Sequence, residues 1–232
     1  MQTLRNEQER MTAMYKINLL LVIAGLVILS GVNVYAEEWK VGEKWTYKHE
    51  GPRPFADSSA TIQGDRTVEV IAIKGEGADK RLLLKTLWGT EDANPTTTYI
   101  DTKKMIHKID IEYLGSLGFI PPVPAIWLLK PGEQKTLKTQ MDIAGFSLNI
   151  EYLAKRLTDE TVTVPAGKFK NCQHVQVITS AQDETGQPVK HKQDYWYHPK
   201  ISNLVKDVVI TNYQGDNSYT STSVLKTHTK KD

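Results

Sequence analysis

The chain has 232 residues, of which 29 are basic and 27 acidic, a formal net charge of +2 and a single cysteine. This balance gives no electrostatic reason to expect nucleic acid or an anionic membrane surface as a partner. One cysteine excludes an intramolecular disulfide, so packing must stabilise the fold.

The N-terminal region has the three parts of a secretory signal. Basic Lys16 precedes an apolar run at 19–29, and small residues follow up to Ala36. We expect cleavage after Ala36, which would leave a single β domain at 37–232. The apolar run is 11 residues long, whereas a membrane-spanning helix needs about 20. The sequence thus predicts an exported protein, periplasmic or extracellular. The alternative is an uncleaved anchor at 17–34, which would be its only membrane contact.

After this segment, apolar and polar residues alternate from end to end, as is typical of half-buried strands. The stretch MIHKIDIEY places Met105, His107 and Ile109 on one face, with Lys108 and Asp110 on the other. The stretches FSLNIEYL, KQDYWYH and LVKDVVITNY follow the same pattern. About ten such strands predict an all-β fold: a strongly curved antiparallel sheet, an open or half barrel, after an N-terminal signal helix.

A short internal repeat suggests two related halves. KVGEKWTYK at 40–48 and KPGEQKTLK at 130–138 share five of nine residues, and each has the pattern of a turn followed by a strand. Between them, FIPPVPAIW carries three prolines, which cannot donate ladder hydrogen bonds and favour an extended crossing segment. We expect the boundary between the halves near 119–127, with an undivided domain as the alternative.

The stretch VPAGKFKNCQHV, 164–175, resembles an active-site loop because it holds the only cysteine and a nearby histidine. We interpret it as a turn that leads into a strand. Pro165 presets the bend, Gly167 supplies the backbone freedom of a tight turn, and Phe169 begins the next strand.

Cys172 and His174 share one face of that strand, since side chains on a strand alternate. Val175 and Val177 lie on the other face, which we expect to be the more buried one. Cys172 and His174 should then face the wetter or lumenal side. As nucleophile and base they would make a hydrolase, but the sequence shows no third group that orients the histidine. A structural role for both residues is our preferred interpretation.

The stretches VPAGKF and YWYHPKISNLVKDV resemble a family of bacterial exported proteins of unknown function. In that family a Pro-Ala-Gly-x-Phe corner precedes a strand, and a Trp-Tyr-x-Pro strand end follows downstream. EEWKVGEKWTYK resembles the start of the same proteins. The chain has Asn203 where the family commonly has a glycine, and asparagine tolerates the left-handed conformation of such a turn. The resemblance implies a curved antiparallel sheet in the cell envelope and carries no catalytic residues over.

Two polar groupings could suggest chemistry. His191, Asp194 and His198 resemble a metal cluster, but along an extended strand Asp194 and His198 lie about 13 Å apart and His191 faces the opposite side. Asp110 and Glu112 could act as paired carboxylates of a glycosidase, although a neighbouring lysine favours a solvated polar face. We therefore predict no metal site, and no motif indicates a cofactor.

Aromatic residues are the remaining candidates, because they suit both protein cores and ligand-lined cavities. Five of them form the predicted ligand-binding set: Trp45, Trp88, Tyr195, Trp196 and Tyr197. Trp39 and Trp127 complete the tryptophans of the chain. Core packing is the competing role for all seven.

The sequence favours a non-enzymatic envelope protein. It would bind an apolar or extended ligand, such as a lipid-like molecule, or another envelope protein by strand pairing. A hydrolase that uses Cys172 and His174 is one alternative. A purely structural or assembly component is the other.

Overall fold

The structure of the chain is a computed structural model that describes residues 39–52, 61–89, 95–112, 115–143, 146–182, 188–211 and 218–231. The predicted signal segment at 1–36 and the alternative anchor at 17–34 lie outside the described residues. Thirteen strands are present: β1 (Lys44–Pro52), β2 (Thr61–Lys74), β3 (Arg81–Trp88), β4 (Thr96–Asp101), β5 (Met105–Ile111), β6 (Gly115–Pro124), β7 (Gln134–Ile143), β8 (Phe146–Arg156), β9 (Glu160–Val164), β10 (Gly167–Gln182), β11 (Pro188–His198), β12 (Asn203–Thr211) and β13 (Tyr219–Thr229). A short 3-10 turn, Gly77–Asp79, joins β2 to β3.

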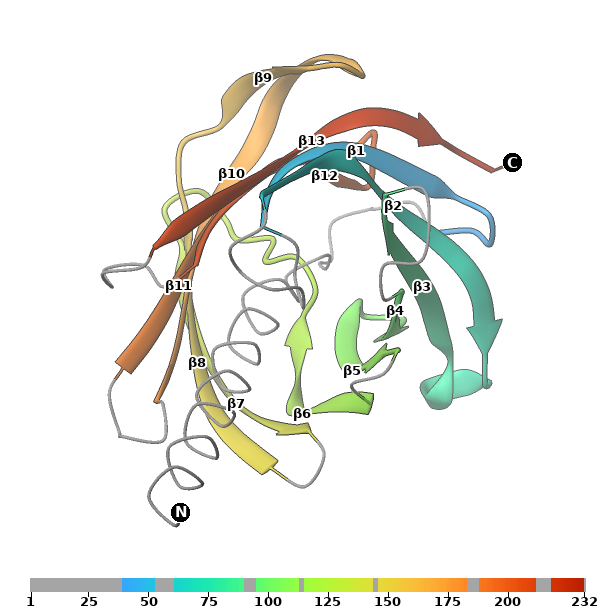
Figure 1. Ribbon diagram of the computed structural model, residues 1–232, viewed down its shortest axis with the longest axis vertical. Helices are drawn as coiled ribbons and strands as arrows, with labels where there is room; N and C mark the ends of the chain where they lie inside the picture. Colours follow the sequence, from blue (N-terminus) through green and yellow to red (C-terminus); the bar gives the residue numbers. More distant parts are fainter. Residues whose placement is uncertain are drawn as a thin grey trace, which may run out of the picture.

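Twelve of these strands close into an antiparallel barrel, which Figure 1 shows with β9 attached beside β10. Each strand pairs with the next along the chain, except that β8 pairs with β10 and β13 pairs with β1. β10 pairs with β8 on one edge and with β11 on the other, so the ring has no gap. The all-β antiparallel prediction is confirmed, whereas the open or half barrel is wrong because both ends of the sheet find partners.

Inward-facing side chains alternate along the strands, as the sequence patterns predict, but bulges shift the register in places. On β5, pairing with β6 shifts between Ile106 and Lys108. Ile106, Ile109 and Ile111 are buried, while His107 is half-buried and bonds Asp101. The expected face of Met105, His107 and Ile109 is therefore wrong, because a bulge adds one residue at this point.

The two copies of the sequence repeat form the same turn. Glu43 N donates to Lys40 O at 2.9 Å, and Glu133 N donates to Lys130 O at the same distance. In both turns the glutamate carboxylate accepts a bond from the lysine amide, and the central glycine has a positive φ. The following strands, β1 and β7, stand six strands apart around the ring. A relationship between two halves stays a prediction.

The prolines of FIPPVPAIW lie within β6 rather than in a separate crossing segment. Pairing of β6 with β7 ends at Ile120, immediately before Pro121. On its other edge, β6 continues to pair with β5 up to Pro124. The prolines thus occupy the part of the strand where β6 leaves β7, which is where a missing N–H is tolerated.

Apolar side chains close the end of the barrel at which β1, β7 and β12 begin. The indole of Trp39 donates to Ser202 O at 3.1 Å, and that of Trp45 donates to Ile201 O at 2.9 Å. The rings of Trp39 and Trp45 meet edge to face with centroids 5.4 Å apart. In the turn that receives them, the residue with left-handed backbone is Ser202, at φ 52°, rather than Asn203.

Within the described ranges, no helix is both long enough and apolar enough to cross a membrane.

Candidate functional site

The VPAGKF stretch forms the hairpin between β9 and β10, as the sequence predicts. Pro165 and Ala166 make the turn, and Gly167 has a φ of 129°. Ala166 N donates to Leu225 O of β13 at 3.1 Å, and Val162 and Val164 are buried. The hairpin is therefore attached to the barrel rather than free of it.

β9 lies on the outer wall of the barrel. Trp196 alternates along β11 with the inward-facing Tyr195 and Tyr197, so its side chain points outward. Its indole donates to the Glu160 carboxylate of β9 at 3.0 Å. The start of β9 therefore lies against an outward-facing side chain of β11, that of Trp196.

Cys172 is fully buried, against the expectation that it faces the wetter side. Cys172 is paired with Glu160 in the β9–β10 ladder, and its Sγ contacts Phe169 O at 3.5 Å. Burial raises the pKa of the thiol. Val175 and Val177 are buried as expected, and His174 stays partly exposed.

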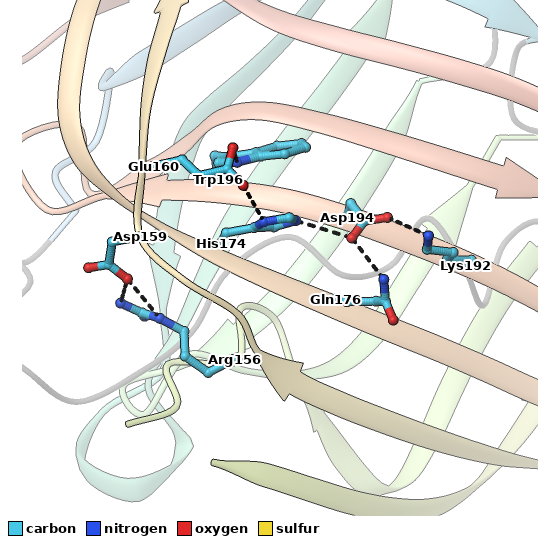
Figure 2. Close-up of polar contacts among 8 residues, drawn as sticks. All are labelled: Arg156, Asp159, Glu160, His174, Gln176, Lys192, Asp194 and Trp196. Carbon is cyan, nitrogen blue, oxygen red and sulfur yellow. Dashed lines mark hydrogen bonds and ion pairs between the residues drawn. The ribbon is translucent and has the colours of Figure 1, made fainter. Parts of the chain in front are cut away.

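His174 stands between two carboxylates (Figure 2). Its Nδ1 lies 2.9 Å from Glu160 Oε1, and its Nε2 lies 3.1 Å from Asp194 Oδ1. The imidazole stacks on the Trp196 ring, with centroids 4.4 Å apart. The histidine thereby joins β9, β10 and β11.

Asp194 extends this network along the outer wall. Its carboxylate also accepts from Gln176 Nε2 at 3.1 Å and from Lys192 Nζ at 3.2 Å (Figure 2). Burial alone would raise the pKa of Asp194, but the bonds from His174, Gln176 and Lys192 hold it below its usual value. Lys206 Nζ lies 4.6 Å from the centroid of the Trp196 ring.

A second ion pair holds the start of β9. Arg156, the last residue of β8, directs Nε and Nη2 at Asp159 Oδ1, at 3.2 and 2.5 Å (Figure 2). Its Nη1 donates to the side chain of Gln173. Asp159 and Glu160 are consecutive, so two neighbouring carboxylates tie β9 to the barrel.

This geometry gives the hydrolase alternative no support. Both ring nitrogens of His174 contact carboxylates, and the Cys172 thiol contacts the backbone carbonyl of Phe169. A buried thiol with a raised pKa is the opposite of an activated nucleophile, which needs thiolate character. The carboxylates that orient His174 come from 14 residues before it and 20 residues after it, which sequence inspection missed.

The other polar groupings do not converge. Among the described residues, no three His, Cys, Asp or Glu side chains are placed to share a metal ion. His191 is buried, whereas Asp194 belongs to the outer network and His198 Nδ1 accepts from Lys200 N at 3.3 Å. Asp110 bonds Ser116 and Lys108, as expected of a solvated polar face.

The five aromatic candidates are all buried, and they fall into separate places. Trp45 belongs to the closed end, and Trp196 belongs to the outer network. The hydroxyl of Tyr195 accepts from Trp127 N at 2.7 Å and donates to Trp127 O at 2.9 Å. Trp88 and Tyr197 face the barrel interior. The structure therefore does not gather the five aromatic residues into one site. Trp45 and Tyr195 instead bond buried backbone groups, those of Ile201 and Trp127.

Trp88 belongs to a buried polar cluster formed by β1, β2, β3, β12 and β13. Arg66 Nη2 contacts Asp207 Oδ1 at 3.4 Å, and its guanidinium lies 4.5 Å from the Tyr47 ring centroid and 5.5 Å from that of Trp88. His49 meets the Trp88 ring edge-on at 4.6 Å. We call Arg66, Asp207, His49 and Trp88 the inner polar cluster.

His49 also bonds Ser223 Oγ at 3.1 Å. Burial, with the positive charge of Arg66, lowers the pKa of His49 to about 4, so the ring is neutral at pH 7. Burial likewise lowers the pKa of His191 to about 4.

Several buried polar atoms have no hydrogen-bond partner in the part of the chain that the structure describes. They are Arg66 Nε, Trp127 Nε1, Gln193 Oε1, Tyr197 OH and Asn203 Nδ2. Buried polar atoms are normally paired, and each exception calls for an explanation. Burial raises the pKa of Tyr197 to about 12, so its hydroxyl is neutral.

No protein-family profile matches the chain, and no curated protein matches it in sequence. Two solved structures are similar to it. One is a Bacteroides fragilis protein that is inferred to be exported and has a YmcC-like fold; it is 14% identical with a TM-score of 0.51, over 83% of this chain and 97% of that chain. The other is an inferred lipoprotein from Parabacteroides distasonis, 10% identical with a TM-score of 0.48, over the same shares. The first similarity shows the class of fold, an all-β barrel of the YmcC-like kind.

Proposed function

We propose that the chain is an exported, non-catalytic binding protein of the cell envelope that holds an apolar or extended ligand, such as a lipid-like molecule, inside its barrel. Export is supported by the signal-like N-terminus and by the inferred export of the similar Bacteroides fragilis protein. The resemblance of VPAGKF and YWYHPKISNLVKDV to bacterial exported proteins agrees with this placement. The protein is periplasmic or extracellular, or anchored by 17–34.

The number of strands carries the proposal for binding. Eight strands enclose an interior that wall side chains fill or that holds one small ligand, and barrel diameter grows with strand number. Twelve strands therefore enclose more space than an eight-stranded wall. The wall turns mainly apolar side chains inward, and the tryptophans of the closed end seal one side. An elongated apolar molecule fits such an interior.

The test is mass spectrometry of the full chain expressed and exported in a bacterial host, first under native conditions and then after solvent extraction. A stoichiometric apolar adduct is expected and would identify the ligand class. A clean mass of the protein alone, retained after incubation with an envelope lipid extract, would overturn ligand binding. Cys172→Ser is the control against a thiol hydrolase, because a binding protein keeps its adduct in this variant.

The second candidate is the binding of an envelope protein by strand addition, and β9 favours it. Of the strands that the structure describes, only β10 pairs with β9, so the other edge of β9 presents backbone groups that a partner strand could bond. If mass spectrometry shows the protein without an adduct, strand addition or a purely structural role is favoured over ligand binding. Replacing Thr163 by proline on β9 would then be expected to abolish partner binding.

A further inference from the structure

The inner polar cluster restricts the kind of polar group that a ligand in the barrel can carry. We propose that the barrel interior recognises an uncharged hydrogen-bonding group, a hydroxyl or a primary amide, at the end of the apolar ligand, and that it rejects an anionic headgroup. This inference rests on the proposed function, since it concerns the same interior.

The polar wall of the site follows from the strand register. Asp207 of β12 is paired with Tyr195 of β11, and Gln193 is the next inward-facing residue of β11. Diagonal neighbours of this kind lie about 7 to 8 Å apart. Arg66, Asp207 and Gln193 therefore form one continuous inward-facing band, and the side chains of all three are buried.

The charges in this band are already balanced. Arg66 is paired with Asp207, and the other buried charged side chains of the described residues, Glu43 and Arg156, contact His228 and Asp159. A carboxylate or phosphate brought to Arg66 would lie beside the Asp207 carboxylate and would lose its hydration without a free cation. The neutral histidines, His49 and His191, add no positive charge at pH 7.

The unpartnered atoms of the band specify a neutral group instead. Arg66 Nε carries a hydrogen that lacks an acceptor, and Gln193 Oε1 is an acceptor that lacks a donor. A hydroxyl or a primary amide can accept from the first and donate to the second. A carboxylate could only accept, so it would leave Gln193 Oε1 unpaired at a cost in affinity.

The experiment uses three probes with the same chain length: dodecanol, dodecanoate and dodecane. The full chain, exported and freed of endogenous adducts by extraction and refolding, is titrated with each probe at pH 7 under native mass spectrometry. We expect dodecanol to bind at least about tenfold more tightly than dodecane, because each satisfied hydrogen bond contributes up to about that factor and the hydroxyl can make two. We expect dodecanoate to bind more weakly than both.

A matched pair of variants locates the effect. Gln193→Leu removes one of the two hydrogen bonds, so it should reduce the preference for dodecanol by up to about tenfold and leave the affinity for dodecane unchanged. Gln176→Leu makes the same substitution on the outer wall, where Gln176 bonds Asp194, and should change neither affinity.

The outcomes separate the two proposals. Tighter binding of dodecanoate than of dodecanol would overturn the neutral-group inference and leave the binding function standing, and so would equal binding of dodecanol and dodecane. If none of the three probes binds, the proposed function itself is overturned, and the inference falls with it.

Discussion

Arg66 on β2 and Asp207 on β12 form an ion pair inside the barrel, with Nη2 and Oδ1 3.4 Å apart and 2% and 4% of the two side chains exposed. Two strands, β13 and β1, lie between them in the ring. The pair therefore joins the N-terminal and C-terminal parts of the sheet from within, beside the ring of Tyr47.

We predict that Asp207→Ala destabilises the protein by roughly 3 to 5 kcal/mol, because it leaves the buried Arg66 charge without a partner. The double variant Arg66→Met with Asp207→Leu should be close to neutral, since it removes both charges. Urea denaturation measures the free energy of unfolding. The control is the exposed pair Lys138–Glu151, where Glu151→Ala should cost about 1 kcal/mol or less. A cost below about 1 kcal/mol for Asp207→Ala as well would show that the inner pair does not stabilise the barrel.

Acid should destabilise the protein over a defined range. The pKa of His49 and of His191 is about 4 in the folded protein, compared with about 6.5 in an unfolded chain. Because the unfolded state binds these protons first, stability is full above about pH 6.5 and falls as the pH decreases toward 4. Each histidine contributes a slope of up to about 1.4 kcal/mol per pH unit.

The measurement is the urea midpoint at pH 7, 5.5 and 4.5. The double variant His49→Gln with His191→Gln should show a shallower decrease than the natural chain. An equal decrease in both proteins would assign the acid sensitivity to other groups.

The thiol of Cys172 should be inert in the folded protein. The side chain is fully buried and burial raises its pKa, so both access and thiolate content are low. We expect an aromatic disulfide reagent to label it at least about 100-fold more slowly in buffer than in urea, since labelling requires local opening. Fast labelling in buffer, at the rate of the unfolded chain, would contradict the burial of Cys172.

Sequence patterns were sufficient for the all-β antiparallel class and for the β9–β10 turn, because strand alternation and the Pro-Ala-Gly corner are local properties. Closure of the barrel was not accessible in this way. It depends on the pairing of β8 with β10 across the intervening β9, and on the pairing of β1 with β13. Neither pairing leaves a local pattern in the residues concerned.

The candidate site was predicted less completely, for the same reason. His174 was singled out, but its partners Glu160 and Asp194 are brought to it by two different hairpins. Arg66 gave no signal, since a single arginine in an alternating strand looks solvent-exposed. The face assigned to Met105 and His107 was wrong because a bulge has no compositional mark when it contains no glycine.

The attachment of β9 to the barrel leads to the last prediction. The Glu160 carboxylate accepts from Trp196 on β11 and bonds His174 on β10, so Glu160→Ala removes both contacts at once. β9 should then open more often: its amides should exchange with solvent about tenfold faster, which corresponds to roughly 1.4 kcal/mol. Labelling of Cys172 should accelerate by a similar factor, because Cys172 pairs with Glu160 in the β9–β10 ladder.

The global urea midpoint should change little in this variant, because β9 lies outside the twelve-stranded ring. Thr163→Ala is the control, since Thr163 is on the same strand and exposed; it should leave both the exchange and the labelling rates unchanged. If Glu160→Ala lowered the global midpoint without a selective effect on β9, the strand would be an integral part of the barrel's cooperative unit. Selective opening would instead show that the Glu160 carboxylate holds β9, a separately opening segment, against β10 and β11.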